Sequence, residues 1–243
     1  MAIEVFNRYE HKYLLNAAQY KRAIAEMDKH MELDAYNKNH EPYMIANIYF
    51  DTESDYLIRK SLAKPEYKEK LRLRAYGVPQ KGDKVFLEIK KKVSGIVNKR
   101  RTVITLGDAF RFAETGIRPI IAPYMNKQVI YELEFFINHY KVMPKLYLAY
   151  DRIAYFEKGN PDLRISFDMN IRSRRYDLSP DLGDYGEKLL PDGMYLMEIK
   201  TAVAKPLWLT NLLTEIGAVR NSFSKYGTEY KNYLNAKNEK IAI

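Results

Sequence analysis

Apolar and polar residues alternate along several segments of the chain with the period of two that is typical of β-strands. In residues 67–77, YKEKLRLRAYG, four cations share one side and three apolar residues share the other: Lys68, Lys70, Arg72 and Arg74 against Leu71, Leu73 and Ala75. This pattern and β-rich composition predict eight strands, at residues 3–14, 43–52, 67–76, 84–93, 97–105, 145–157, 163–174 and 194–202. Turn-forming links such as GVPQKGD and KGNPD favour antiparallel pairing of neighbouring strands.

Apolar residues at helical spacing predict six helices between and after these strands. They cover residues 17–31, 53–64, about 107–115, 120–140, and the segments PLWLTNLLTEIG and SKYGTEYKNYLN. Asn16 is a plausible N-cap for the first helix, and Pro206 opens the fifth. No low-complexity linker or repeat divides the sequence. We therefore expect residues 1–243 to form one α+β domain dominated by antiparallel strands.

Seven of the predicted strands carry one apolar side and one charged side. In residues 163–174, Arg164, Ser166, Asp168, Asn170 and Arg172 oppose Ile165, Phe167, Met169 and Ile171. One interpretation is an ordinary sheet whose polar face meets water. Because Lys and Arg dominate the charged sides of so many strands, we favour another. The apolar sides would face outward under the helices, and the charged sides would line the lumen of a closed β-barrel.

Composition narrows the chemistry that the chain can perform. Its 243 residues include 40 Lys and Arg against 31 Asp and Glu, and the net charge of +9 suggests an anionic partner: nucleic acid, a phosphate compound or a membrane surface. Cysteine is absent, which excludes disulfides, thiolate zinc sites and a cysteine nucleophile and makes the cytoplasm the expected location. The four histidines show no metal-ligand spacing, and no run of about 18 apolar residues could span a bilayer.

A row of cations that faces inward needs compensation. Neighbours on the same face of a strand lie about 6.6 to 7 Å apart. Two cations at that distance repel by roughly 2 kcal/mol at an effective dielectric constant near 20. Glu10, Glu88, Asp168 and Glu198 offset part of this repulsion. A chain of phosphates bound in the lumen would offset the rest.

Six motifs resemble one known family when taken together. They are YEHKYLL, YKEKLRLRAYG, FLEIKKKVSGIVNKRR, YDRIAYFEKGNPDLRISFD, LMEIK and SKY, in this order across nearly the whole chain. The combination resembles the VTC (vacuolar transporter chaperone) domain, the polyphosphate polymerase branch of the triphosphate tunnel metalloenzymes. The resemblance implies an eight-stranded antiparallel β-barrel with a charged lumen, helices packed outside, and a divalent metal, Mn²⁺ or Mg²⁺.

The resemblance also implies which residues form the site. Phosphate contacts would come from Lys12, Arg72, Arg74, Lys90, Lys99, Arg101, Arg152, Arg164, Lys200, Ser224 and Lys225, and catalysis from Arg72, Arg74, Lys90, Arg152, Arg164 and Lys200. Glu198 would hold the metal, with Glu10 and Glu88 as weaker metal candidates. Lys99 and Arg101 depend on the register of their strand, because a slip of one residue would present Arg100 instead. Asp168 is expected to order nearby arginines rather than bind metal.

One departure from the superfamily pattern bears on the reaction. Many hydrolases of the superfamily begin with a strand that reads E-x-E-x-K, whereas this chain has Arg8, Glu10 and Lys12 at the same spacing. The loss of one acid favours phosphate transfer or binding over hydrolysis. Transfer needs positioning and charge neutralisation more than covalent help from the protein. The attacking phosphate oxygen is already anionic, so no general base is required.

The leading hypothesis is therefore a polyphosphate polymerase that transfers the γ-phosphate of ATP to a polyphosphate chain. A binding module for polyphosphate, nucleotides or inositol phosphates is one alternative, and a tripolyphosphatase of the same fold is another. The expected partners are ATP and polyphosphate or triphosphate. No specific nucleic acid is expected, because strand alternation places the cations rather than an exposed basic tail. The resemblance also suggests a membrane-protein partner, although the chain shows no transmembrane segment.

Overall fold

The computed structural model describes residues 9–94, 96–202 and 204–241. Eleven strands in these ranges form one antiparallel sheet. The strands are β1 Tyr9–Leu15, β2 Met31–Leu33, β3 Tyr43–Asp51, β4 Tyr67–Tyr76, β5 Lys84–Val93, β6 Ile96–Thr105, β7 Met143–Glu157, β8 Asn160–Arg174, β9 Glu187–Lys188, β10 Tyr195–Thr201 and β11 Arg220–Asn221. The helices are α1 Ala17–His30, α2 Tyr56–Leu62, α3 Leu106–Thr115, α4 Lys127–Tyr140, α5 Leu207–Glu215 and α6 Lys225–Ile241, with short 3₁₀ turns at Lys38–His40 and Pro180–Leu182.

The eight predicted strands correspond closely to the eight long strands of the sheet. The bounds of β4 and β5 agree with prediction, and the first predicted strand begins at Tyr9 because residues 3–8 lie outside the described ranges. The short strands β2, β9 and β11 were not predicted, since two or three residues show no period. The helix predicted at 120–140 begins only at Lys127. Pro119 and Pro123 interrupt the preceding segment, and the Asn126 side chain caps the helix by accepting from the Val129 N–H at 3.1 Å.

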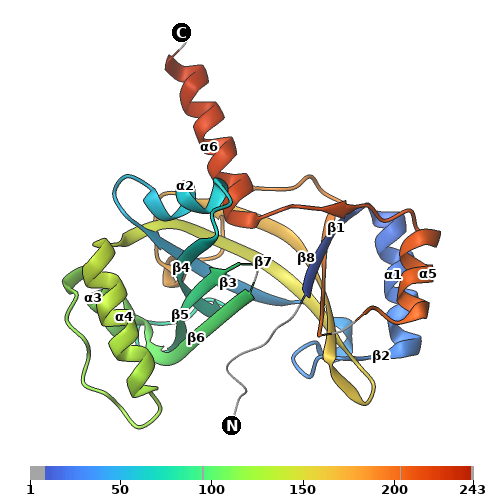
Figure 1. Ribbon diagram of the computed structural model, residues 1–243, viewed down its shortest axis with the longest axis horizontal. Helices are drawn as coiled ribbons and strands as arrows, with labels where there is room; N and C mark the ends of the chain where they lie inside the picture. Colours follow the sequence, from blue (N-terminus) through green and yellow to red (C-terminus); the bar gives the residue numbers. More distant parts are fainter. Residues whose placement is uncertain (1–8, 95, 203, 242–243) are drawn as a thin grey trace.

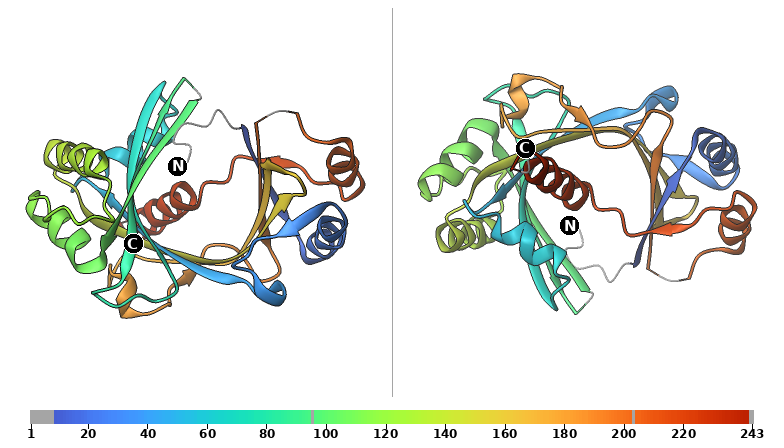
Figure 2. Two further views of the ribbon diagram at one scale, coloured as in Figure 1. Left: turned by 90° about the horizontal axis from the view of Figure 1, so that it is seen from below. Right: turned by 90° about the horizontal axis from the view of Figure 1, so that it is seen from above.

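The prediction of a closed eight-stranded barrel is wrong for the described residues. The sheet runs in the order β11-β1-β10-β8-β7-β3-β4-β5-β6, and no described strand joins β6 to β11. Instead the sheet curves into two limbs that face each other, β4–β6 on one side and β1 with β10 on the other (Figure 2). Strand β11 occupies part of the outer edge of β1. The first turn of α6 lies between the two limbs (Figure 2).

The prediction that apolar sides face outward under helices is confirmed for both limbs. Helices α3 and α4 cover the outer side of β4–β6, and α1 and α5 cover β1, β8 and β10 (Figures 1 and 2). The first core includes Leu71, Leu73, Leu87 and Ile89 with Phe112, Ile130 and Leu133 from the helices. The second includes Phe167, Met197 and Ile199 with Met27 and Leu209. Both sets are almost fully buried, so the polar sides of these strands face the space between the limbs.

A third core closes one end of that space from the inside. Ile45, Leu146, Leu148 and Leu196 point inward from β3, β7 and β10, and they pack against Phe223, Tyr226 and Tyr230 at the foot of α6. The rest of α6 projects away from the body of the molecule (Figure 1). The space between the limbs is therefore lined by charged side chains over only part of its length, whereas the sequence predicted a charged lumen throughout. Its α6 end is apolar, because β3 and β7 place aliphatic residues on their inner sides.

Candidate functional site

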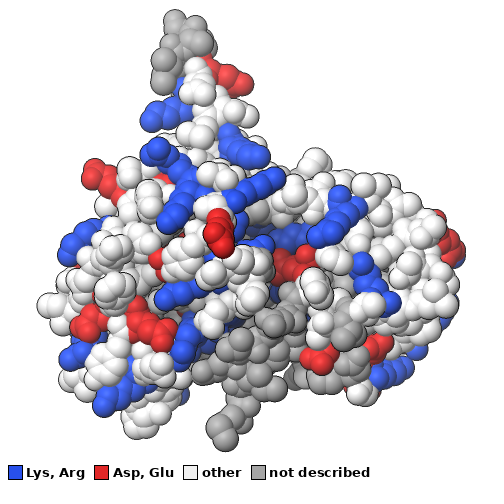
Figure 3. Space-filling model, in the orientation of Figure 1, with Lys and Arg blue, Asp and Glu red and all other residues white. Residues whose placement is uncertain are grey.

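A cavity of about 720 Å³ lies between the two limbs of the sheet. Ten lysines, six arginines and three glutamates line it. Figure 3 shows Lys and Arg side chains gathered around a hollow below the foot of α6, with acidic side chains beside it. An anionic ligand with several charges matches this lining better than a neutral or cationic one does.

The structure brings all fourteen predicted site residues together in this one cavity. They are Glu10, Lys12, Arg72, Arg74, Glu88, Lys90, Lys99, Arg101, Arg152, Arg164, Glu198, Lys200, Ser224 and Lys225. They come from β1, β4–β8, β10 and the segment that begins α6. Arg8, which occupies the position of the missing acid, lies outside the described residues.

The side of the cavity formed by β4–β6 carries many cations and one carboxylate. We call it the cation wall and define it by Lys68, Lys70, Arg72, Arg74, Glu88, Lys90, Lys92, Lys99 and Arg101. Lys70 lies opposite Lys90, and Lys90 lies opposite Lys99, in the strand register. Like charges therefore stand side by side across three strands. The predicted register of β6 is confirmed, since Lys99 and Arg101 face the cavity while Arg100 lies 3.4 Å from Glu132 on α4.

Glu88 is the centre of the cation wall. Arg72 donates from Nε to Glu88 Oε1 at 2.6 Å, and Lys99 Nζ lies 2.7 Å from Oε2. Burial would raise the pKa of Glu88, but Arg72, Arg74 and Lys99 hold it well below its usual value. This single carboxylate cannot compensate the neighbouring lysines. Burial and the charge of Lys90 lower the pKa of Lys70 to about 7. Burial, together with Arg74 and Arg72, lowers the pKa of Lys99 to about 7 despite Glu88.

The opposite side of the cavity is built differently. We call it the paired wall and define it by Glu10, Lys12, Arg152, Arg164, Asp168, Glu198, Lys200 and Lys225. Arg152 donates to both oxygens of Asp168, from Nε at 2.6 Å and from Nη2 at 2.8 Å. Lys225 donates to Asp168 and to Glu198, the latter at 3.2 Å. All four of these side chains are nearly buried. The prediction that Asp168 orders an arginine is confirmed.

Two carboxylates of the paired wall share the same two lysines. Lys12 Nζ lies 3.3 Å from Glu10 and 3.5 Å from Glu198, and Lys200 Nζ lies 3.8 Å from each. Burial opposes ionisation of both acids. Lys200 nevertheless lowers the pKa of Glu10 to about 2, and Lys225 and Lys12 hold that of Glu198 well below its usual value. Both carboxylates are therefore ionised at neutral pH.

These two carboxylates fit part of a divalent metal site. Across the described ranges, no three His, Cys, Asp or Glu side chains are grouped closely enough to hold a metal. Mg²⁺ in phosphate-transferring sites is commonly held by one or two carboxylates, with phosphate oxygens and water as the remaining ligands. Glu10 and Glu198 match that donor set. The oxygens of Glu88 contact Arg72 and Lys99 instead.

Several cavity residues were not assigned to the site from the sequence. Lys68 and Lys70 share the charged side of β4 with Arg72 and Arg74, so the alternation contained their signal. For Tyr150, no pattern in the sequence indicated a place in the site. Its hydroxyl lies 3.5 Å from Arg74, and its ring lies 4.5 Å from Lys225 Nζ. Burial would raise its pKa, but Arg74 and Arg152 lower it. This phenol therefore links the two walls.

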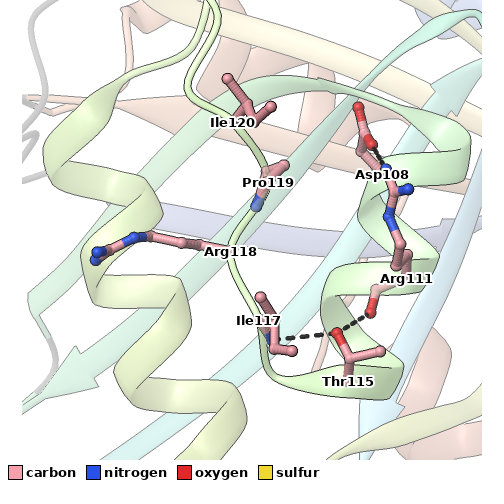
Figure 4. A pocket seen from close by; sticks show the side chains of 7 residues that line it. All are labelled: Asp108, Arg111, Thr115, Ile117, Arg118, Pro119 and Ile120. Carbon is pink, nitrogen blue, oxygen red and sulfur yellow. Dashed lines mark hydrogen bonds and ion pairs between the residues drawn. The ribbon is translucent and has the colours of Figure 1, made fainter.

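A second, smaller hollow of about 290 Å³ lies on the outside of the molecule, beside α3 and the segment that follows it (Figure 4). Arg111 is paired with Asp108 there, and Arg118 with Glu134 at 3.0 Å. Ile117 and Ile120 expose their side chains beside it. With its cations already paired, this hollow has no excess of charge for an anion. The cavity between the limbs is the candidate site.

Comparison with known proteins identifies the family and the fold. The family model described as VTC domain matches residues 7–234. A search of curated proteins gave no match. One similar solved structure is a candidate adenylate cyclase from Bacillus halodurans, with 13% identity, a TM-score of 0.53, and coverage of 91% of this chain and 96% of that one. Another is a candidate adenylyl cyclase from Hippeastrum described as having a dominant triphosphatase activity, with 14% identity, a TM-score of 0.53, and coverage of 92% and 96%. At these identities the structures show a shared fold alone.

The described helices include none that is both long and apolar enough to cross a membrane.

Proposed function

The chain belongs to the VTC domain family, and we propose that it is a polyphosphate polymerase that uses ATP as the phosphate donor. The observation that carries the proposal is the cavity between the limbs, where sixteen cations face three carboxylates. Its volume of about 720 Å³ is within the range of small-molecule and cofactor sites. The excess positive charge suits a ligand with several linked phosphates.

In this proposal the cation wall holds the phosphates in line. Arg72 and Arg74 supply planar forks that suit bidentate contacts, and Lys90, Lys99 and Arg101 add positive charge from β5 and β6. An oxygen of the terminal phosphate of the chain attacks the γ-phosphorus of ATP. A new P–O bond forms, the bond between γ-phosphorus and the β-phosphate oxygen breaks, and ADP leaves with that electron pair. The attacking oxygen carries no proton near neutral pH, so the step needs no general base.

The paired wall completes the site in two ways. Lys12, Arg152, Arg164, Lys200, Ser224 and Lys225 line it and would contact the phosphates that the cation wall does not reach. Glu198 and Glu10 would hold the metal because they share Lys12 and Lys200 as neighbours, and Glu88 is a weaker metal candidate because the described residues place no second carboxylate in the cation wall beside it. When bound, Mn²⁺ or Mg²⁺ would neutralise charge that develops on the phosphate oxygens.

The experiment that tests the proposal uses the purified 243-residue chain with ATP and Mn²⁺, with and without a pyrophosphate or triphosphate primer. We expect polyphosphate and ADP to accumulate, with polymer resolved on a gel. Glu198→Gln is expected to lower turnover at least about tenfold by weakening the metal site. Glu114→Gln, on the exposed side of α3, is the matched control and should keep full activity. Circular dichroism of both variants checks that they fold.

Other outcomes would identify a different activity of the same cavity. Release of orthophosphate from ATP or tripolyphosphate with no polymer would identify a tripolyphosphatase. Tight binding of tripolyphosphate with no chemical turnover would identify a binding module. Either result rejects the polymerase and keeps the cavity as the site.

A further inference from the structure

A group of aromatic side chains stands at the edge of the cavity and takes no part in the phosphate contacts described above. The rings of Tyr36 and Tyr43 lie 6.0 Å apart, those of Tyr43 and Tyr76 lie 5.9 Å apart, and Phe86 lies 6.1 Å from Tyr76. Tyr36 and Tyr76 are nearly parallel, at 14° and 6.2 Å. We call these four residues the aromatic platform. They come from the loop before β3 and from β3, β4 and β5.

The platform is open to solvent on one side and continuous with the cavity on the other. Tyr36 is 76% exposed and Tyr76 is 49% exposed. Tyr43 and Tyr76 also line the cavity. The rings pack against one another, and yet most of Tyr36 and half of Tyr76 stay in water. What separates this cluster from other exposed tyrosines, such as Tyr176, is that it adjoins the cavity, where a bound ligand can reach it.

The platform begins where the rows of arginines end. Tyr76 lies two residues beyond Arg74 on the same side of β4, a separation of about 6.6 to 7 Å along the strand. Tyr43 lies opposite Arg152 in the pairing of β3 with β7. A ligand whose phosphates contact these arginines therefore has its next chemical group beside the rings.

We infer that the aromatic platform is a nucleobase subsite, where the base of a nucleoside triphosphate stacks while its phosphates lie in the cavity. The inference rests on the proposed function, which makes a nucleotide the donor. Every base presents a flat π-face, and stacking on aromatic side chains is a common way to bind it. Polyphosphate has no such group. The platform therefore distinguishes the donor nucleotide from the polyphosphate acceptor, which the cations alone cannot do.

The surroundings of the platform predict weak discrimination between bases. Asn37 is the nearest buried amide along the chain, and its polar atoms are already used. Its Nδ2 donates to the backbone oxygens of Glu41 and Arg152 at 3.0 and 2.7 Å, and its Oδ1 accepts from the Ala154 N–H at 2.9 Å. The guanidinium of Arg101 lies over the ring of Phe86 at 4.6 Å, so it adds a cation beside the rings rather than a base-specific contact. We expect ATP and GTP to bind with similar affinity.

The test compares ligands with and without a base. The double variant Tyr36→Ala/Tyr76→Ala removes the exposed part of the platform, and calorimetry measures the binding of ATP, GTP and tripolyphosphate to the full chain. ATP and GTP should each bind about tenfold more weakly, the effect of losing one stacked base. The affinity for tripolyphosphate should change less than about twofold, because no residue of the cation wall or the paired wall is altered. Tyr176→Ala is the matched control, since Tyr176 is 57% exposed beside Tyr185 and outside the cavity lining.

A further variant separates the ring from the hydroxyl. Tyr76→Phe keeps the π-face and should retain the affinity of the wild-type protein for ATP. An unchanged ATP affinity in the double variant overturns the subsite, and so does an equal loss for ATP and tripolyphosphate. A wild-type protein that binds tripolyphosphate but not ATP overturns it as well. Failure of the polymerase proposal is read separately, from the absence of polymer in the assay with Mn²⁺.

Discussion

The two walls of the cavity carry the same kind of cation in different electrostatic surroundings. The cation wall on β4–β6 has eight cations and the single carboxylate of Glu88. The paired wall has five cations and three carboxylates, and its centre is a buried network of Arg152, Asp168, Lys225 and Glu198. One wall is satisfied by the protein itself, and the other is left with an excess of positive charge.

This difference assigns different tasks to the two walls. Buried ions need partners in fixed geometry, so the paired wall contributes to the folded state whether or not a ligand is present. The cation wall keeps like charges opposed, and neighbours about 6.6 to 7 Å apart repel by roughly 2 kcal/mol at an effective dielectric constant near 20. A bound polyanion removes that repulsion. The comparison therefore predicts that loss of Asp168, at the centre of the paired wall, affects stability most, and that substitutions in the cation wall affect mainly binding.

The largest effect is expected for Asp168→Ala in the paired wall. This change leaves Arg152 and Lys225 buried beside Glu198 with too little negative charge. Removing one partner of a buried ion pair typically lowers the free energy of unfolding by roughly 3 to 5 kcal/mol. Urea denaturation followed by circular dichroism measures the loss. Asp192→Ala is the control, because Asp192 pairs with Lys188 on the surface at 77% exposure and should change stability by less than about 0.5 kcal/mol.

Equal stability of these two aspartate variants would show that the network is not structural. The distinction between the walls would then lose its energetic basis, and the paired cations would have to be regarded as ligand contacts only.

The second prediction concerns Arg74→Ala in the cation wall. Among the described residues, Arg74 donates to two neutral oxygens, Asn47 Oδ1 at 3.3 Å and the Tyr150 hydroxyl at 3.5 Å. Its loss removes this donor from the buried Asn47 side chain, so the free energy of unfolding should fall by about 1 to 3 kcal/mol, less than for Asp168→Ala. Tripolyphosphate should bind roughly 10- to 100-fold more weakly, the effect of losing charge-assisted hydrogen bonds of about 1.5 to 3 kcal/mol.

Calorimetric titration with tripolyphosphate measures this loss, and Arg118→Ala serves as the matched control, because Arg118 lies in the segment after α3 and pairs with Glu134 on α4, outside the cavity. If Arg74→Ala were instead to unfold the protein while binding stayed intact, the tasks of the two walls would be reversed.

The composition of both walls could be predicted from the sequence, because strand alternation fixes which side chains share a face. Arg72 and Arg74 share one side of β4, and Lys90 shares one side of β5 with Glu88, as period two alone predicts. Which carboxylates pair with which of these cations could not be predicted from the alternation. Arg152 and Lys225 are far apart in the sequence and meet through Asp168 and Glu198, contacts that depend on how α6 returns to the sheet.

Whether the sheet closes into a barrel could not be predicted from the sequence, for a related reason. Alternation describes each strand, but closure depends on whether the two terminal strands of the sheet meet. In the described residues they do not, and the foot of α6 lies between the limbs. Tyr226 there donates to Asp51 at 3.2 Å, a contact between the last helix and β3. No local pattern around either residue indicates this pairing.

The smallest effect is expected in the pH dependence of the cation wall. Lys70 has a pKa of about 7 in the folded protein because burial and Lys90 disfavour its charge, against an ordinary value of 10.5. Between these values the unfolded chain holds a proton that the folded chain lacks. The stability of the free protein should therefore rise with pH through this window. Anion binding follows the opposite sign, because a phosphate favours the charged lysine, so the affinity for tripolyphosphate should fall as pH rises above 7.

Lys70→Met tests both signs at once. Removing this uncompensated cation should raise stability at pH 6, where Lys70 is charged in the wild-type protein, and flatten the rise in stability above pH 7. Lys70→Met should also make the affinity for tripolyphosphate less dependent on pH between pH 6 and pH 9. Because only one proton is lost with Lys70, the difference in slope between variant and wild type should be less than about tenfold per pH unit. Lys158→Met, on the surface outside the cavity, should alter neither profile. Were Lys70→Met to destabilise the protein at pH 6, Lys70 would have a partner in the folded state, and the cation wall would be as internally compensated as the paired wall.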